Sequence, residues 1–287
     1  MGIDKPFLIA NRNCGLGDIL GNAALCWYLA KKSNSNLIID WQKTVYNNYK
    51  TPVNLFSAIF NNESIDEVEV FEPCNFNNDY GIQIKNKFSN QYSKMMLKDY
   101  KFNELGQDFI AYNFFKKLNL NKSIKNSIKK FYKNKLKGRE TVSVHFRYGD
   151  HDEFLFRGNR KKFASLGFSK GESKEYNILN CFKLYKKKID ELLLFNSNLL
   201  VMIFTDCQYF AKLLSEEYDC IDTLNSYPDS NQALHLAKEN DPLKKINEAA
   251  TCMFLMKNYS DFLICNQSNF NYWPRLFIPK FNQTVLF

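Results

Sequence analysis

The stretch Phe7–Trp41, FLIANRNCGLGDILGNAALCWYLAKKSNSNLIIDW, predicts the fold. It opens with a short apolar strand, Phe7–Ala10, and passes through a polar turn that contains glycines. Residues Ile19–Lys32 then repeat apolar side chains at helical spacing and end in lysines, as a helix does. Residues Asn36–Trp41 are a second buried strand. A strand, a helix and a strand in this order begin a parallel sheet.

A second series of strands and helices begins at residue 141. Strands are expected at Thr141–Phe146, Leu199–Phe204, Asp219–Leu224 and Asp261–Cys265, and helices at Glu175–Phe195, Tyr209–Leu214, Leu243–Lys257 and Ser268–Leu276. Residues Gln42–Leu120 show no clear period and are expected to form irregular loops and helices. The sequence therefore predicts an α/β protein with two Rossmann-like doubly wound domains that face a cleft, residues 1–138 and 139–287.

Composition narrows the class of protein without choosing a function. The chain has 287 residues, of which 45% are hydrophobic, so it can bury a sizeable core. Its eight cysteines form no C-x-x-C pair, which argues against a zinc ribbon or a dithiol site. The start resembles no signal peptide and no apolar run is long enough to span a bilayer, so a cytoplasmic protein is expected. A net charge of +9 admits nucleic acid, anionic lipid or phosphorylated small molecules as partners.

Residues Asn121–Gly138 combine many lysines with apolar residues at about every fourth position. The pattern predicts an amphipathic helix with a basic outer face that ends at Gly138. The simplest interpretation is a solvated helix face. The alternative is a peripheral contact with anionic lipid or with an acceptor, at the inner face of the membrane.

The segment Val142–Asp150, VSVHFRYGD, is the strongest candidate for a binding site. Ligands of open parallel sheets gather at the carboxyl ends of strands, where Arg147 stands. An arginine there can direct two N–H donors at a diphosphate. The alternative is a structural ion pair between Arg147 and Asp150 or Asp152.

Glycines between the first strand and the first helix form a second candidate site. Gly15, Gly17 and Gly21, followed by Asp40, imitate a dinucleotide fingerprint, although the third glycine comes one residue late. A tight turn in which Asp18 caps the helix explains the same residues.

Polar residues that follow other predicted strands leave two interpretations open. Asp206, Ser268 and Asn269 can either contact a ligand or cap the helices that they precede. Asp150, Asp152 and Glu153 are candidate bases. No pattern of metal ligands is present, so no metal and no cofactor is expected.

HFRYGD resembles the H-x-R-[RH]-x-[DN] signature of the α1,2-, α1,6- and protein O-fucosyltransferases, and most of all the bacterial nodulation α1,6-fucosyltransferase group. Three further stretches are similar to that group in order and spacing: CGLGDILGNAALCWYLAKKSNSNLIIDW, LLVMIFTDC and AATCMFLMKNYSDFLICNQSNFNYWPRLF. The resemblance implies a glycosyltransferase of B-type architecture that inverts at the sugar carbon without a metal, with GDP-fucose against the C-terminal domain and the acceptor mostly against the N-terminal one.

The resemblance also implies roles for individual residues. Arg147 would hold the β-phosphate of GDP, His145 would support the loop, and Ser268 would lie near the phosphates. The remaining residues of the expected site are Tyr148, Asp206, Glu248 and Asn269 for the donor, Asp152 and Glu153 as bases, and Gly15, Gly17 and Asp18 in the cleft.

Two positions depart from the family pattern. Tyr148 stands where relatives carry a basic residue, and Cys252 falls where they carry an aspartate that contacts guanine, with Glu248 one turn earlier as a substitute. The resulting prediction is transfer of fucose from GDP-fucose, or of another sugar from its nucleotide, to a glycan or lipid-linked glycan of a cell-surface polysaccharide or glycolipid.

Two other functions stay open. An NAD(P)-dependent oxidoreductase would use the turn at Gly15, Gly17 and Gly21. A nucleic-acid or anionic-surface binding protein would use the positive charge, although the basic residues gather on one helix and do not alternate with aromatics along a groove. We therefore expect no nucleic-acid partner.

Overall fold

The computed structural model describes Lys5 and residues 7–42, 44–46, 53–71, 107–148, 173–223 and 241–286. These residues form a mixed α/β fold with two sheets that are mostly parallel, as the sequence predicts. The chain divides into two compact units, residues 1–126 with 241–250 and residues 127–240 with 251–287. The domain boundary at residue 138 stays a prediction.

The N-terminal unit begins with the expected strand–helix–strand unit. Strand β1 (Phe7–Ala10) leads through the glycine turn into helix α1 (Leu16–Lys32), which returns the chain to β2 (Asn36–Ile39). β1 and β2 pair in parallel along their whole lengths. Two short strands complete a sheet of order β1-β2-β4-β3: β4 (Val68–Phe71) is parallel to β2, and β3 (Ser64–Ile65) is antiparallel to β4.

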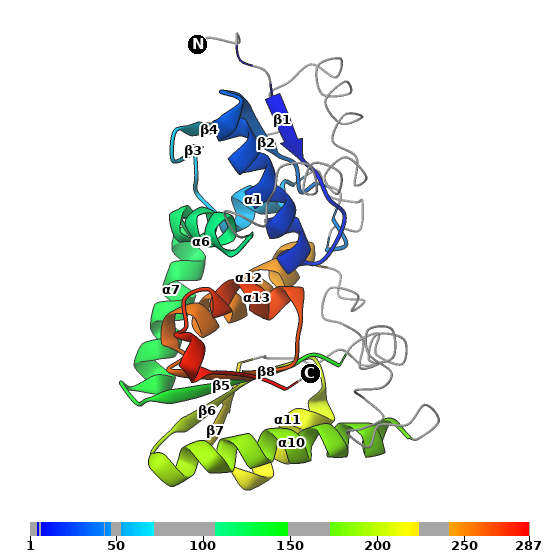
Figure 1. The fold of residues 1–287 in the computed structure, drawn as a ribbon, viewed down its shortest axis with the longest axis vertical. Helices are drawn as coiled ribbons and strands as arrows, with labels where there is room; N and C mark the ends of the chain where they lie inside the picture. Colours follow the sequence, from blue (N-terminus) through cyan, green and yellow to red (C-terminus); the bar gives the residue numbers. More distant parts are fainter. Residues whose placement is uncertain are drawn as a thin grey trace. The chain divides into compact units, whose positions relative to one another are not determined.

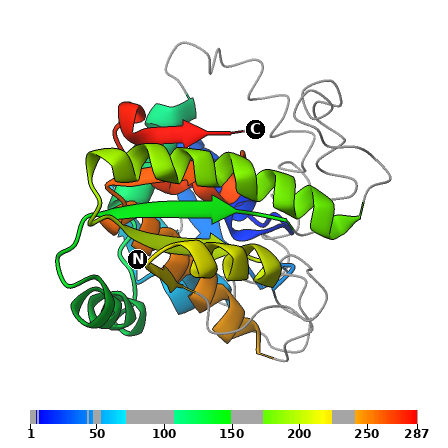
Figure 2. The same cartoon turned by 90° about the horizontal axis from the view of Figure 1, so that it is seen from below.

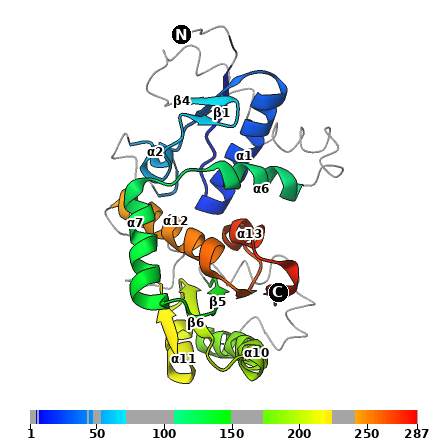
Figure 3. The same ribbon diagram turned by 90° about the vertical axis from the view of Figure 1, so that its left-hand side faces the viewer.

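Helix α1 is the centre of packing in this unit, because most of its residues are buried. The indole of Trp27 donates from Nε1 to the carbonyl oxygen of Ile65 at 2.9 Å. Its ring lies 5.8 Å from that of Phe114 in helix α6 (Gln107–Lys117), which runs beside α1 (Figure 3). Helix α2 (Leu55–Ile59) begins at Asn54, whose side-chain amide donates to the carbonyl oxygen at the end of β2 at 2.8 Å.

The C-terminal unit contains a five-stranded parallel sheet of order β7-β6-β5-β8-β9. Its strands are β5 (Thr141–Phe146), β6 (Leu200–Thr205), β7 (Cys220–Asp222), β8 (Phe262–Cys265) and β9 (Gln283–Val285). The chain winds outward from β5 in one direction and then returns to β8 on its other side. This is the strand order of a doubly wound fold, whose topological switch point lies between β5 and β8.

Helices cover both faces of this sheet. Helices α10 (Lys174–Phe195) and α11 (Gln208–Glu217) lie on one face, and α12 (Pro242–Tyr259) and α13 (Asn269–Arg275) lie on the other (Figure 1). Seen from below, α10 runs alongside β5 (Figure 2). Because both faces are covered, β5 and β6 are buried at every residue.

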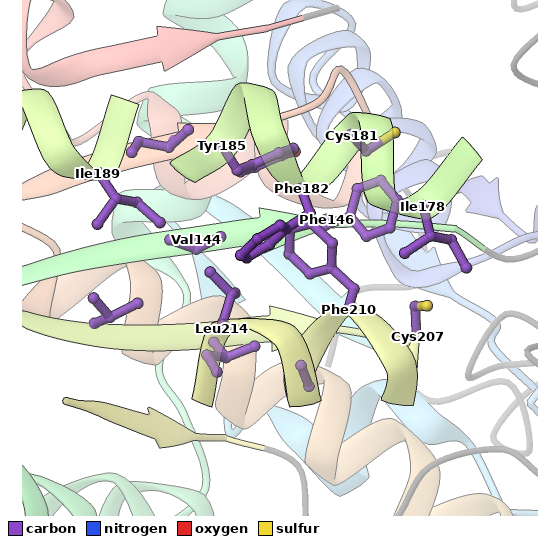
Figure 4. Packing of buried hydrophobic residues seen from close by; sticks show 14 of the residues in the cluster. Val144, Phe146, Ile178, Cys181, Phe182, Tyr185, Ile189, Cys207, Phe210 and Leu214 are labelled. Carbon is purple, nitrogen blue, oxygen red and sulfur yellow. The ribbon is translucent and has the colours of Figure 1, made fainter. Parts of the chain in front are cut away.

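Aromatic side chains fill the space between β5 and the helices α10 and α11. The ring of Phe146 lies 4.2 Å from that of Phe210 and 5.7 Å from that of Tyr185 (Figure 4). All three side chains are fully buried. The Tyr185 hydroxyl also donates to the carbonyl oxygen of His145 at 2.9 Å, so the core holds the end of β5 directly.

The basic segment forms the expected helix. Helix α7 (Lys122–Phe131) continues as a π-helical turn, Tyr132–Leu136, and ends at Lys137 and Gly138, which both have positive φ. Ile124, Ile128 and Leu136 are buried, and the lysines are exposed. Within the residues that the structure describes, no helix is long and apolar enough to cross a bilayer.

Candidate functional site

Arg147 and Asn266 follow the two strands that flank the switch point, and their main chains are tied together. The amide oxygen of Asn266 accepts the Arg147 N–H at 3.1 Å, and its Nδ2 donates to the Arg147 carbonyl oxygen at 3.0 Å. The main-chain N–H of Asn266 donates to the carbonyl oxygen of His145 at 3.3 Å. One buried side chain therefore extends the ladder between β5 and β8 by a residue and fixes the main chain at Arg147.

His145 lies beneath this contact and is buried in its neutral form. Nδ2 of Asn271 donates to its Nδ1 at 3.0 Å and also to the Asn266 carbonyl oxygen at 2.6 Å, so the imidazole proton resides on Nε2. The ring of Phe270 stacks on the imidazole at 5.6 Å. Burial, and then the nearby charge of Arg147, lower the pKa of His145 to about 3. The histidine is therefore a neutral support and adds no positive charge beside Arg147 at neutral pH.

Asp206 and Tyr148 form a second tie between neighbouring strand ends. Asp206 follows β6, is 6% exposed, and accepts the Tyr148 N–H on Oδ1 at 2.7 Å. The Tyr148 side chain is buried in the apolar cluster around Phe146. The position after Arg147, where the family pattern has a basic residue, is thus occupied by a buried aromatic side chain. The contacts of Asp206 and Tyr148 with a donor stay predictions.

Arg147 itself is only half-buried, and no described carboxylate pairs with its guanidinium. Asp150, the alternative ion-pair partner, and the candidate bases Asp152 and Glu153 lie outside the described residues. Within the described part of the site, the arrangement is an arginine whose main chain is fixed at the carboxyl end of the central strand. This is the position where an open α/β sheet binds anionic ligands.

Ser268 is the N-cap of α13, since its Oγ accepts the Asn271 N–H at 3.2 Å. Asn269 is the exposed first residue of the same helix. On α12, Glu248 is half-buried, whereas Cys252 is buried and its thiol donates to Oγ1 of Thr223 at 3.8 Å. The substitution of the expected aspartate by Cys252 therefore places a thiol–hydroxyl contact beside the end of β7.

The glycine turn of the N-terminal unit differs from the prediction in one respect. Helix α1 begins at Leu16, three residues earlier than predicted, and its N-cap is Gly15. Asp18 therefore lies in the first turn and does not cap the helix; its Oδ1 lies 3.6 Å from Nη2 of Arg12. The first helical N–H, that of Leu16, donates to the Tyr46 hydroxyl at 3.1 Å. These contacts occupy part of the site that a dinucleotide phosphate would need.

Sequence reasoning missed Asn266 and Asn271, the two amides that hold Arg147 and His145. The available signal was the position of Asn266, directly after a buried strand, which is the same signal that pointed to Asp206. No group of three metal-ligating side chains occurs in the described ranges.

Several solved structures with a similar fold are fucosyltransferases. The fold is that of the B-type glycosyltransferases represented by fucosyltransferase structures. A fucosyltransferase NodZ from Bradyrhizobium is 19% identical, with 96% of this chain and 94% of that chain covered and a TM-score of 0.60. NodZ α-1,6-fucosyltransferase soaked with GDP-fucose is 17% identical over the same shares, with a TM-score of 0.59. POFUT1 in complex with GDP-fucose is 12% identical, with 99% and 98% covered and a TM-score of 0.56.

Within that class, residues 4–80 match the family described as nodulation protein Z (NodZ). The chain is therefore NodZ-like in its fold and in the sequence of its first strand–helix–strand unit, as its motifs predict. The comparison with curated proteins gives no match.

Proposed function

We propose that the protein is an inverting, metal-independent glycosyltransferase that transfers fucose from GDP-fucose to a glycan. The observation that carries the proposal is Arg147 at the switch point of a sheet whose fold matches a fucosyltransferase soaked with GDP-fucose. The family match over residues 4–80 supports the same class from the other end of the chain.

In this proposal Arg147 directs its guanidinium at the diphosphate of the donor. As the bond between fucose and GDP breaks, negative charge develops on the β-phosphate, and a fixed cation there lowers the barrier. Asn266 and His145 keep the arginine in place, the first through its main chain and the second as a neutral neighbour. A protonated His145 would repel the guanidinium, so its low pKa favours the function.

The other half of the reaction needs a base that takes a proton from the acceptor hydroxyl. Asp152 and Glu153 are the proposed candidates. Ser268, Asn269 and Glu248 would complete the donor site, with Glu248 accepting hydrogen bonds from the guanine base. The acceptor, a glycan or lipid-linked glycan of a cell surface, would lie mostly against the N-terminal unit, near Gly15, Gly17 and Asp18. Peripheral membrane contact through residues 121–138 would bring a lipid-linked acceptor within reach.

The alternative of an oxidoreductase is less well supported, because the turn at Gly15 directs a hydrogen bond to Tyr46 and carries the negative charge of Asp18. A nucleic-acid binding protein is also less well supported, since the comparisons point to fucosyltransferase folds.

A thermal-shift screen with GDP, UDP, CDP and NAD(P) tests the proposal on the wild type and on Arg147→Ala. GDP should stabilise the wild type. Loss of the paired, charge-assisted hydrogen bonds of the guanidinium should weaken GDP binding about 10- to 100-fold. Arg139→Ala is the matched control, because Arg139 lies at the opposite end of β5 and pairs with Asp219 at 2.7 Å. Undiminished stabilisation of Arg147→Ala by GDP would remove the assignment. Release of GDP from GDP-fucose, measured with and without a chelator, then tests the reaction and its independence of metal.

A further inference from the structure

Three side chains are the most exposed of the large apolar residues that the structure describes in the C-terminal unit. Leu194 and Phe195 end helix α10 and are 85% and 91% exposed, and Phe281 in the turn Lys280–Asn282 is 88% exposed. Isolated exposed apolar residues are common on proteins. These three are of interest because hydrogen bonds of neighbouring residues bring them to the same edge of the sheet.

The end of α10 and the turn Lys280–Asn282, which carry these side chains, are both connected by hydrogen bonds to residues at the start of β5. Asn196, which follows Phe195, donates from its side chain to the Glu140 carboxylate, and Nη2 of Arg139 donates to the Asn198 carbonyl oxygen at 3.2 Å. The end of α10 therefore lies beside residues 139–140, immediately before β5.

The turn that carries Phe281 reaches the same place from the other side. Nδ2 of Asn282 donates to the Asp261 carbonyl oxygen at 2.8 Å. The Asp261 carboxylate in turn accepts the Thr141 N–H at 2.8 Å. Leu194, Phe195 and Phe281 thus flank the amino-terminal edge of the parallel sheet.

The basic segment ends at this edge as well. Lys129, Lys130, Lys133, Lys135 and Lys137 are exposed and form no ion pair within the described residues. Residues 121–139 contain no acidic side chain. Arg139 is paired with Asp219, so the free positive charge comes from the lysines. In Figure 2 the turns that precede β5, the beginning of β5 and the end of α10 gather at the same side of the sheet.

We propose that this edge, formed by the five lysines with Leu194, Phe195 and Phe281, is a docking surface for an anionic phospholipid bilayer. Lysines attract the anionic headgroups, and exposed aromatic and aliphatic side chains enter the interface below them. The combination distinguishes this edge from a solvated basic helix, which would need no apolar side chains around it. The strands run in parallel from this edge to the one that carries Arg147, so docking leaves the proposed donor site of the same unit free.

Cosedimentation of the whole protein with vesicles tests the proposal. Binding is expected to vesicles with about 30% phosphatidylserine and not to pure phosphatidylcholine, and to weaken at about 0.5 M salt. The triple variant Lys129→Glu, Lys130→Glu, Lys133→Glu should bind at least about 100-fold more weakly, at about fivefold for each lysine. The double variant Phe195→Ser, Phe281→Ser should lose about tenfold or more.

The triple variant Lys116→Glu, Lys183→Glu, Lys212→Glu is the matched control, since it changes the net charge equally at exposed lysines of α6, α10 and α11. It should keep most of the binding. Equal loss in both triple variants, or no binding to anionic vesicles, would overturn the proposal. The proposal would also be overturned if the phenylalanine variant bound vesicles as the wild type does while an oligonucleotide bound through the lysines. A dimer that buries the phenylalanines would overturn it as well. No donor or acceptor is present in this assay, so its outcome and that of the GDP assay are independent.

Discussion

Replacement of Asn266 by alanine isolates the contact on which the candidate site depends. The substitution removes the acceptor of the Arg147 N–H and the donor to the Arg147 carbonyl oxygen, at 3.1 and 3.0 Å. Asn266 is 4% exposed, so water has little access to replace it. The two main-chain groups of Arg147 then lose their partners where the central strand ends.

A buried main-chain group without a partner costs about 1–3 kcal/mol, and Arg147 is half-buried, so a loss of about 2–4 kcal/mol in the free energy of unfolding is expected. Urea or thermal unfolding measures this loss, and the melting temperature should fall by about 5–10 °C. The freed main chain also misplaces the guanidinium. At a temperature where the variant is still folded, donor turnover should fall about 100-fold, because positional errors near 1 Å have effects of this size.

Two further variants separate this contact from general damage. Asn266→Asp keeps an acceptor for the Arg147 N–H but no longer donates to its carbonyl oxygen, so its stability should lie between wild type and Asn266→Ala. Asn282→Ala removes a single, more exposed amide contact at the opposite edge, which should cost about 1 kcal/mol or less and leave GDP binding intact. An Asn266→Ala protein with wild-type stability and wild-type GDP affinity would refute the reasoning.

Two other predictions concern stability. The folded state keeps His145 neutral while the unfolded state binds a proton below pH 6.5, so this residue contributes stability above pH 6.5 that is lost as the pH falls toward about 3. Urea unfolding between ~pH 7 and ~pH 5 should show a contribution of up to about 1.4 kcal/mol per pH unit that His145→Gln lacks; an unchanged slope in that variant would contradict it. Phe210→Ala empties the space beside Phe146 and should cost about 3–5 kcal/mol, whereas Leu194→Ala, at an exposed position, should stay within about 0.5 kcal/mol. Similar losses in the two variants would show that the core is assigned wrongly.

The sequence predicts elements well where a run of residues is buried on every side. Strand β5 begins and ends where the apolar pattern predicts, and the helix at Lys174–Phe195 differs by one residue at its start. Strands β4 and β9 escaped prediction for the opposite reason. Two of the three residues of Gln283–Val285 are polar and none is fully buried, and only the first residue of Val68–Phe71 is fully buried. Such strands form because a neighbouring strand offers hydrogen bonds to them, and their own sequence has no apolar pattern that predicts this.

The same difference holds for the candidate site, whose contacts with a ligand stay predictions. Arg147 could be chosen because one buried strand precedes it, which is a local pattern. The part played by Asn266 depends on β8 lying next to β5, although about 120 residues separate the two in the chain. Strand order arises from the packing of the whole unit, and no local pattern contains it. Asn271 was hidden further, because it is a polar residue of a short helix that proves to be fully buried against His145.

The same difference separates two parts of the proposed donor site, the phosphate contact and the contact with the base. The position of Arg147 follows from the main chain of two adjacent strands, and the hydrogen-bond ladder leaves that main chain little freedom. A contact with the nucleotide base depends instead on one helical side chain, which can change without disturbing the sheet. Cys252 lies where the resemblance implies an aspartate, and its thiol donates to Thr223. In the proposed donor site, Arg147 therefore keeps its position on the sheet, whereas the contact with the base is proposed for Glu248, one helical turn before Cys252.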